Sequence, residues 1–86
     1  MEPRRETRPG LDEMIEQLMA AGCTDLAVLE PDWVAGTSPR GNRITLSWDE
    51  ERSALTLIRY LIRRDGSTMV GRFRLLATAA RTAATL

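Results

Sequence analysis

The 86-residue chain contains no histidine and no lysine, and its single cysteine is Cys23. Without histidine the chain lacks the usual general base, the commonest metal ligand and any Ser-His or Cys-His nucleophile pair. Without lysine it lacks Schiff-base chemistry and the lysine of a phosphate-binding loop. Cys23, Tyr60 and the carboxylates remain, but no pair of them has the spacing of a catalytic motif. The sequence therefore predicts a protein that is not an enzyme, with no metal and no cofactor.

The chain also lacks the means that small proteins use to reinforce a limited core. A chain of this length buries only about 60–65 % of its unfolded surface. One cysteine makes no internal disulfide, and no zinc pattern is present. Small chains of this kind gain stability by oligomerising or by docking on a partner. We therefore expect one domain over residues 11–86, preceded by a flexible arm at 1–10, with an interface to a second copy or to another protein.

Long apolar runs are missing too. No stretch approaches the roughly 20 residues of a membrane span, and the first ten residues are charged and carry no apolar signal region. A lone free cysteine fits a reducing compartment. These features predict a cytoplasmic protein with no membrane contact.

Charge is balanced in total but divided along the chain. Residues 1–39 hold three Arg against eight Asp and Glu, whereas residues 40–86 hold nine Arg against four acids. An acidic half beside a basic half is typical of a polyanion-binding module with an acidic appendage. The alternative is that the two halves attract each other within the fold.

The N-terminal half predicts one helix and one strand. Apolar residues recur with a helical period over 11–21, acids fill the first turn, and Gly22 is placed to end the helix. Residues 23–30 form a short apolar run that predicts a strand. Residues 31–42 are rich in Pro, Gly and small polar residues, which predicts a loop pinned to the core by Trp33 and Val34.

The C-terminal half predicts one strand followed by two helices. Residues 43–48 alternate in polarity, as strands do. Ser47 and Glu50 have the spacing of a capping box, and a polar stripe continues over a predicted helix at 48–64. Gly66 would end that helix, and Ser67 or Thr68 would begin another that runs to about residue 84. The predicted fold class is therefore α+β, mainly helical, with an N-terminal helix, one or two short strands and a C-terminal helix pair.

A second interpretation of this half is an antiparallel β-meander. Its strands would lie at 43–48, 53–63 and 68–77, and Asp65-Gly66 would form a hairpin turn. We prefer the helices because the capping box, the polar stripes and the terminal glycine agree. The alternative fold class is thus a helix plus an antiparallel meander.

The predicted order of strand, helix, glycine turn and helix resembles the ribbon-helix-helix family of DNA-binding proteins, which includes Arc-like repressors. The resemblance covers only residues 43–77 and rests on the run Arg43–Glu51, the turn Asp65–Thr68 and the apolar positions Met69, Phe73 and Ala77. It implies a dimer whose paired strands enter the major groove, with outward side chains on base edges. The function that follows is a homodimeric DNA-binding regulator of transcription.

The same resemblance implies which residues touch DNA. Base contacts would come from the outward positions of the strand, and phosphate contacts from the start of the second helix. The implied nucleic-acid-binding residues are Arg43, Thr45, Ser47, Thr68, Arg72 and Arg74.

A different class of function is also compatible with the chain. It is a small protein-interaction module, such as an accessory subunit or a phage-type inhibitor protein, that docks on a larger protein. The docking surface would be the apolar region from Trp33 to Trp48 or the arginine-rich face. Binding to DNA through arginines weakens steeply with salt, whereas apolar docking is nearly insensitive to salt.

Overall fold

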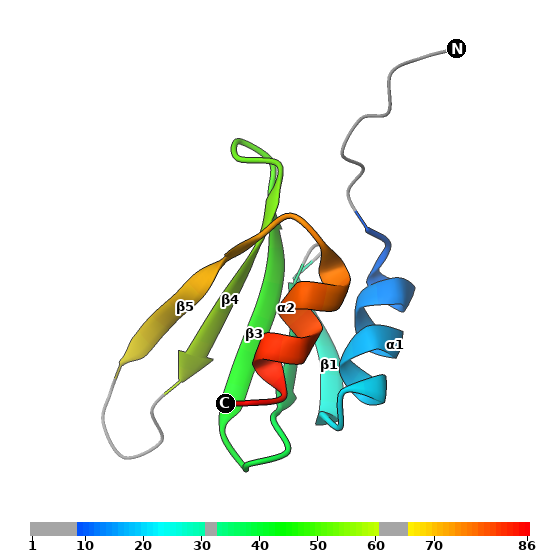
Figure 1. Cartoon of the computed structure of the whole chain (residues 1–86), viewed down its shortest axis with the longest axis vertical. Helices are drawn as coiled ribbons and strands as arrows, with labels where there is room; N and C mark the ends of the chain where they lie inside the picture. Colours follow the sequence, from blue (N-terminus) through cyan, green and yellow to red (C-terminus); the bar gives the residue numbers. More distant parts are fainter. Residues whose placement is uncertain (1–8, 31–32, 61–65) are drawn as a thin grey trace.

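The computed structural model describes residues 9–30, 33–60 and 66–86. Within them the chain begins with helix α1 (Leu11–Ala20) and ends with helix α2 (Leu76–Ala83). Between the helices lie five strands, which are β1 (Thr24–Glu30), β2 (Trp33–Thr37), β3 (Arg43–Asp49), β4 (Ala54–Tyr60) and β5 (Ser67–Phe73). The two helices lie on the same side of the sheet (Figure 1).

The five strands form one antiparallel sheet in which sequence order is also spatial order, β1-β2-β3-β4-β5. β3 is the central strand, and it is paired along its length with β2 on one side and β4 on the other. β1 and β5 are the edge strands. The register of the β1–β2 pair shifts twice, between Thr24 and Ala27 and between Val28 and Glu30. The register of the β4–β5 pair shifts once, between Leu57 and Ile58.

Local hydrogen bonds explain the two turns that flank β3. Between β2 and β3 the Ser38 amide donates to the Asn42 carbonyl (2.8 Å), and the Asn42 amide donates to the Ser38 hydroxyl (3.2 Å). Between β3 and β4 one carboxylate oxygen of Asp49 accepts from the amides of Glu51 (3.1 Å) and Arg52 (3.3 Å). Aspartate favours turns because its short side chain can accept hydrogen bonds from backbone amides just ahead of it.

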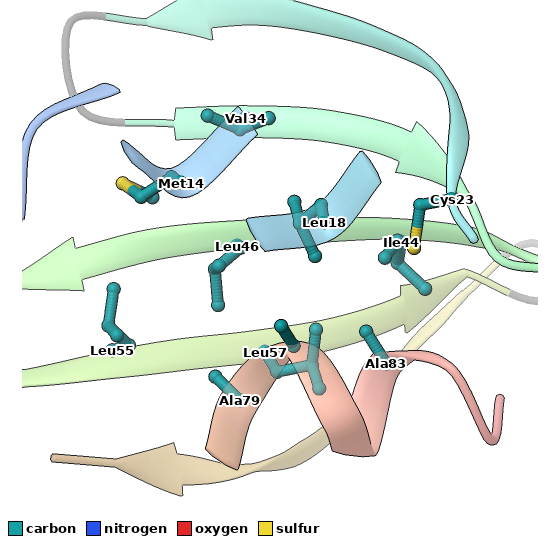
Figure 2. Close-up of a cluster of buried hydrophobic side chains, with 11 residues drawn as sticks. Met14, Leu18, Cys23, Val34, Ile44, Leu46, Leu55, Leu57, Ala79 and Ala83 are labelled. Carbon is teal, nitrogen blue, oxygen red and sulfur yellow. The ribbon is translucent and has the colours of Figure 1, made fainter. Parts of the chain in front are cut away.

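The core lies between the helices and one face of the sheet. Figure 2 shows side chains of α1 and α2 directed toward apolar side chains of β2, β3 and β4. The largest fully buried side chains are Met14, Leu18, Val34, Ile44, Leu46, Leu55 and Leu57. α2 contributes only alanines to the buried cluster, Ala79, Ala80 and Ala83. Their small size lets the helix lie close to the sheet, so that a short chain still fills its interior.

The predicted mainly helical fold is wrong, because strands outnumber helices and the chain from 43 to 73 contains no helix among its described residues. Residues 54–60 and 67–73 are β4 and β5, and only the last part of the second predicted helix is helical, as α2. The three strands of the alternative meander overlap β3, β4 and β5. Its proposed turn at Asp65 lies outside the described residues.

The signals that predicted the first C-terminal helix have other roles. Ser47 lies within β3 and caps no helix, and the turn after β3 is held by Asp49 instead. The loop predicted at 31–42 contains β2, in which Val34 is fully buried. Three consecutive residues of β2, Val34, Ala35 and Gly36, are buried, so this strand lies inside the sheet despite the prolines and glycines around it.

The predictions for residues 11–30 agree with the structure. α1 and β1 lie where a helix and a strand are expected. Gly22 has a φ of +97°, and the Cys23 amide donates to the Leu18 carbonyl (2.9 Å), which closes the end of α1. Of the arm predicted at 1–10, residues 1–8 lie outside the described part of the chain.

Candidate functional site

The two helices pack on one face of the sheet and leave the opposite face uncovered (Figure 1). Because side chains alternate along a strand, the strand pairing places its residues in three cross-strand rows. One row contains Glu30, Trp33, Ser47, Thr56 and Arg72; the next contains Ala27, Ala35, Thr45, Ile58 and Met69; the third contains Thr24, Thr37, Arg43, Tyr60 and Ser67. We call these residues the open face.

The centre of the open face is small and closely packed. Ala35, Thr45 and Ser47 are 5 %, 3 % and 8 % exposed, although no helix covers them. The hydroxyl oxygens of Thr45 and Tyr60 lie 3.4 Å apart, so the phenol ring of Tyr60 leans along the sheet toward Thr45. Neighbouring side chains on the open face therefore account for this burial, and the centre of the face is formed by packed side chains.

The margin of the open face carries the larger side chains. Trp33 in β2 and Met69 in β5 are exposed, on opposite sides of the small centre. Arg43 and Arg72 are also exposed and lie at diagonally opposite positions. Aromatic residues, Met and Arg are the types enriched in the cores of protein–protein interfaces.

The structure brings together four of the six residues that the family resemblance implies. Arg43, Thr45, Ser47 and Arg72 all belong to the open face. Thr45 and Ser47 are nevertheless too deeply buried to reach a base edge. β3 has no free edge, so it cannot pair with a second copy into a two-stranded ribbon.

The other two implied residues lie elsewhere. Thr68, in β5, is paired with Arg59 of β4, and this pair lies on the side of the sheet that faces the helices. Arg74 follows β5 and is exposed. The predicted helix N-terminus near Thr68 and Met69 is wrong, because both residues are in a strand and α2 begins only at Leu76.

The prediction that Trp33 pins a loop to the core is wrong. Its side chain is 36 % exposed, and its pairing with Ser47 places it on the open face. Trp48 packs against the core on the other face. The region from Trp33 to Trp48 is therefore not one docking surface, because its two tryptophans lie on opposite sides of the sheet.

The predicted site residues do not include Ile58, Tyr60 and Met69, which the strand pairing places on the open face. Ile58 and Tyr60 look like core positions in sequence, since apolar and aromatic residues usually alternate with polar ones in a strand with one exposed face. Apolar residues at both odd and even positions of 54–60 are the signal that β4 has an apolar residue on each face.

The other groups that could take part in chemistry have structural roles. Burial raises the pKa of the Cys23 thiol, which keeps it protonated and unreactive. Among the described residues no group of three Cys, Asp or Glu side chains is arranged to hold a metal ion. A hollow of about 180 Å³ lies between α1 and α2 and is lined by Gln17, Ala20, Ala21, Ala77, Ala80 and Arg81. Its four alanines offer no chemistry beyond an apolar wall.

The pKa of Asp49 is lowered by the hydrogen bonds that this residue accepts within the turn. Desolvation opposes the shift, but hydrogen bonds from the side chain and backbone of Arg52 and from the Glu51 amide outweigh it and favour the carboxylate. The Arg52 guanidinium lies 3.1 Å from the carboxylate. This acid is therefore engaged within the β3–β4 turn.

These features define the class of molecule, an antiparallel five-stranded meander with two helices on one face and a mixed apolar and charged surface on the other. No protein-family model matches the chain, and neither a curated protein nor a solved structure has significant similarity to it. Neither described helix has the length and apolar character required to cross a membrane. The function is therefore inferred from the open face itself.

Proposed function

We propose that this protein is a non-enzymatic interaction module that docks on a larger protein through the open face. The observation that carries the proposal is the composition and position of this face. Trp33, Ile58, Tyr60 and Met69 lie on it together with Arg43 and Arg72. Tryptophan, tyrosine and arginine are the residues that most often dominate binding energy in protein interfaces.

The packing of the open face supports the same function. Binding costs free energy when flexible side chains become ordered. The centre of the open face avoids that cost, because its buried alanine, threonine and serine side chains are short and already packed. The Tyr60 ring is partly positioned by its contact with Thr45. A partner would meet a preformed surface with two exposed apolar side chains, Trp33 and Met69.

The dimensions of the face predict the strength of binding. Neighbouring strands are about 4.8 Å apart and residues about 3.4 Å apart along a strand, so this face covers on the order of 450 Å². Stable interfaces bury about 800 Å² on each partner. A partner that covers only the open face therefore forms a small interface, of the size found in transient complexes.

A matched pair of substitutions tests the proposal. Met69 on the open face and Met19 on α1 are both exposed, at 48 % and 61 %. Met69→Asp places a charge within the face, whereas Met19→Asp places the same charge on the helix layer. Each variant and the wild-type chain would be immobilised and exposed to an extract of the source organism, with and without nuclease.

The proposal predicts a protein that is retained by the wild type and by Met19→Asp but not by Met69→Asp, with or without nuclease. Retention that is equal for both variants would contradict docking through the open face. Far-ultraviolet circular dichroism on both variants checks that each remains folded.

Binding of DNA is the competing proposal, and one observation favours it. Arg43 and Arg72 lie on the same face as Trp33 and Tyr60, and cations beside aromatic rings also bind single-stranded nucleic acid. The chain as a whole has zero formal net charge, unlike most nucleic-acid-binding domains. Retention of DNA by the wild type, lost with nuclease and falling steeply with salt, would favour this function over protein docking.

A further inference from the structure

Two arginines occupy the part of the open face formed by β3, β4 and β5. In the three rows, Arg43 and Arg72 are the charged residues at the paired positions of β3, β4 and β5. Glu30 occupies the β1 end of the row that contains Trp33, and the strand pair Asp49–Ala54 adds Asp49 at the border of the face. Asp49 is already bonded to Arg52. Neither Arg43 nor Arg72 forms a hydrogen bond through its side chain or an ion pair with any residue that the structure describes. The open face thus presents two exposed, unpaired guanidinium groups.

Three exposed acidic side chains lie on the opposite layer. Asp12, Glu13 and Glu16 are exposed on α1, which packs on the helix side of the sheet. An approaching molecule with acidic groups is attracted by the open face and repelled by α1, so charge orients the encounter.

We propose that the partner of the open face is an acidic protein segment that carries carboxylates on both sides of an apolar centre. This inference rests on the proposed function and specifies its partner. Arginine pairs with carboxylates in a planar, bidentate geometry, so two such contacts would fix the register of the segment. The apolar residues of the segment would lie over Ile58 and Met69, which are paired between the rows of Arg43 and Arg72.

The strand pairing also predicts the spacing of those carboxylates. Arg43 and Arg72 lie two strands apart and two rows apart. From the usual strand and residue spacings their Cα atoms are about 16 Å apart along the diagonal of the face. An extended segment spans that distance in about five residues, and a helix in about eleven. Acidic residues placed next to each other would engage only one of the two arginines.

A selection from random peptides tests the partner's chemistry and does not require that the partner be identified first. A phage-displayed library of random peptides about 15 residues long, enough to span the diagonal even as a helix, would be selected on the immobilised full chain. Recovered peptides would be synthesised, and their binding measured by fluorescence anisotropy to the wild type, to Arg43→Gln with Arg72→Gln, and to Arg81→Gln. Arg81 is an exposed arginine on α2 and serves as the matched control.

The inference predicts acidic peptides with at least one apolar residue between separated carboxylates. Their affinity should fall by about tenfold in the double variant, as expected for the loss of two exposed ion pairs, and should stay unchanged in Arg81→Gln. Replacing the carboxylates of the peptide by amides should lower affinity for the wild type by a similar factor.

Other outcomes would overturn the inference, and they also show whether docking through the open face fails with it. Peptides without acidic residues that lose binding in Met69→Asp would refute the acidic partner and retain docking through the open face. Peptides that bind Met69→Asp as well as the wild type would refute both. Self-association of the wild type in light scattering, lost in the double arginine variant, would identify a second copy as the occupant and also overturn the inference.

Discussion

The hydroxyl groups of Thr45 and Tyr60 lie 3.4 Å apart across two neighbouring strands on the open face. Thr45 is 3 % exposed, so its hydroxyl has little access to water. The contact joins the central strand β3 to the end of β4, and it holds an aromatic side chain along a surface that we propose binds a partner. It therefore links the stability of the sheet to the shape of the face.

Removal of the Tyr60 hydroxyl tests this contact. Tyr60→Phe keeps the ring but leaves the buried Thr45 hydroxyl without that partner, so we expect the free energy of unfolding to fall by about 1 kcal/mol. Thr45→Val should lower stability as well. The double variant should cost less than the sum of the two single changes, because the contact is lost only once. Urea unfolding followed by circular dichroism measures all three, and strict additivity would show that the two hydroxyls do not interact.

Core truncation should distinguish the covered face of β4 from the exposed apolar residues. Leu57 is fully buried against the helices, so Leu57→Ala should lower the free energy of unfolding by about 2–5 kcal/mol. Leu75 is 65 % exposed, so Leu75→Ala should change stability by no more than about 0.5 kcal/mol. Urea unfolding midpoints provide the comparison. Equal effects would contradict the assignment of the helix-facing side of β4 to the core.

The contrast between β4 and α1 explains which elements are predictable. The apolar positions of α1 occupy a single stripe, because only one side of this surface helix meets the core, and its boundaries follow from the sequence. β4 alternates between the core at Leu55 and Leu57 and the open face at Ile58 and Tyr60. Because both faces of that strand carry apolar side chains, the alternation of polar and apolar residues is lost. The polar residues that remain have a helical spacing by coincidence, which favours the wrongly predicted helix at 48–64.

The candidate site is predictable only in part for the same reason. Arg43, Thr45 and Ser47 are expected on one face of a strand, and alternation alone places them there. Their neighbours from β2 and β5 depend on strand order, which no local pattern encodes. The misplacement of Trp33 has this origin, since a proline- and glycine-rich composition conceals a five-residue strand.

The end of α1 predicts a specific requirement for glycine. Gly22 has a φ of +97°, and a Cβ added there would lie 3.0 Å from the Pro39 side chain. Gly22→Ala should therefore lower the free energy of unfolding by about 1–2 kcal/mol, mainly through backbone strain. Gly66→Ala is the control, because no atom lies within 4 Å of its added Cβ. Thermal unfolding of the two variants gives the comparison, and a neutral Gly22→Ala would refute the strained conformation.

The Asp49 turn predicts how stability depends on acid. The pKa of Asp49 is lowered in the folded chain by its hydrogen bonds to Arg52 and Glu51, against an opposing effect of desolvation. A group whose pKa is lower when folded contributes stability above its unfolded pKa and loses that contribution as pH falls through the folded value. For Asp49 the window lies at and below the ordinary value of 3.8.

Asp49→Asn removes this titration while keeping an oxygen that accepts the two backbone amides. Asparagine removes the negative charge but preserves the turn geometry, because its side chain supports similar turns. We expect the variant to be less stable than the wild type at pH 7, and the difference to shrink as pH falls from about 5 to 2. Glu16→Gln removes an exposed acid on α1 and controls for general charge effects. Urea unfolding across this pH range measures the difference, and a gap that stays constant with pH would show that the Asp49 carboxylate is not stabilised by its contacts with Arg52.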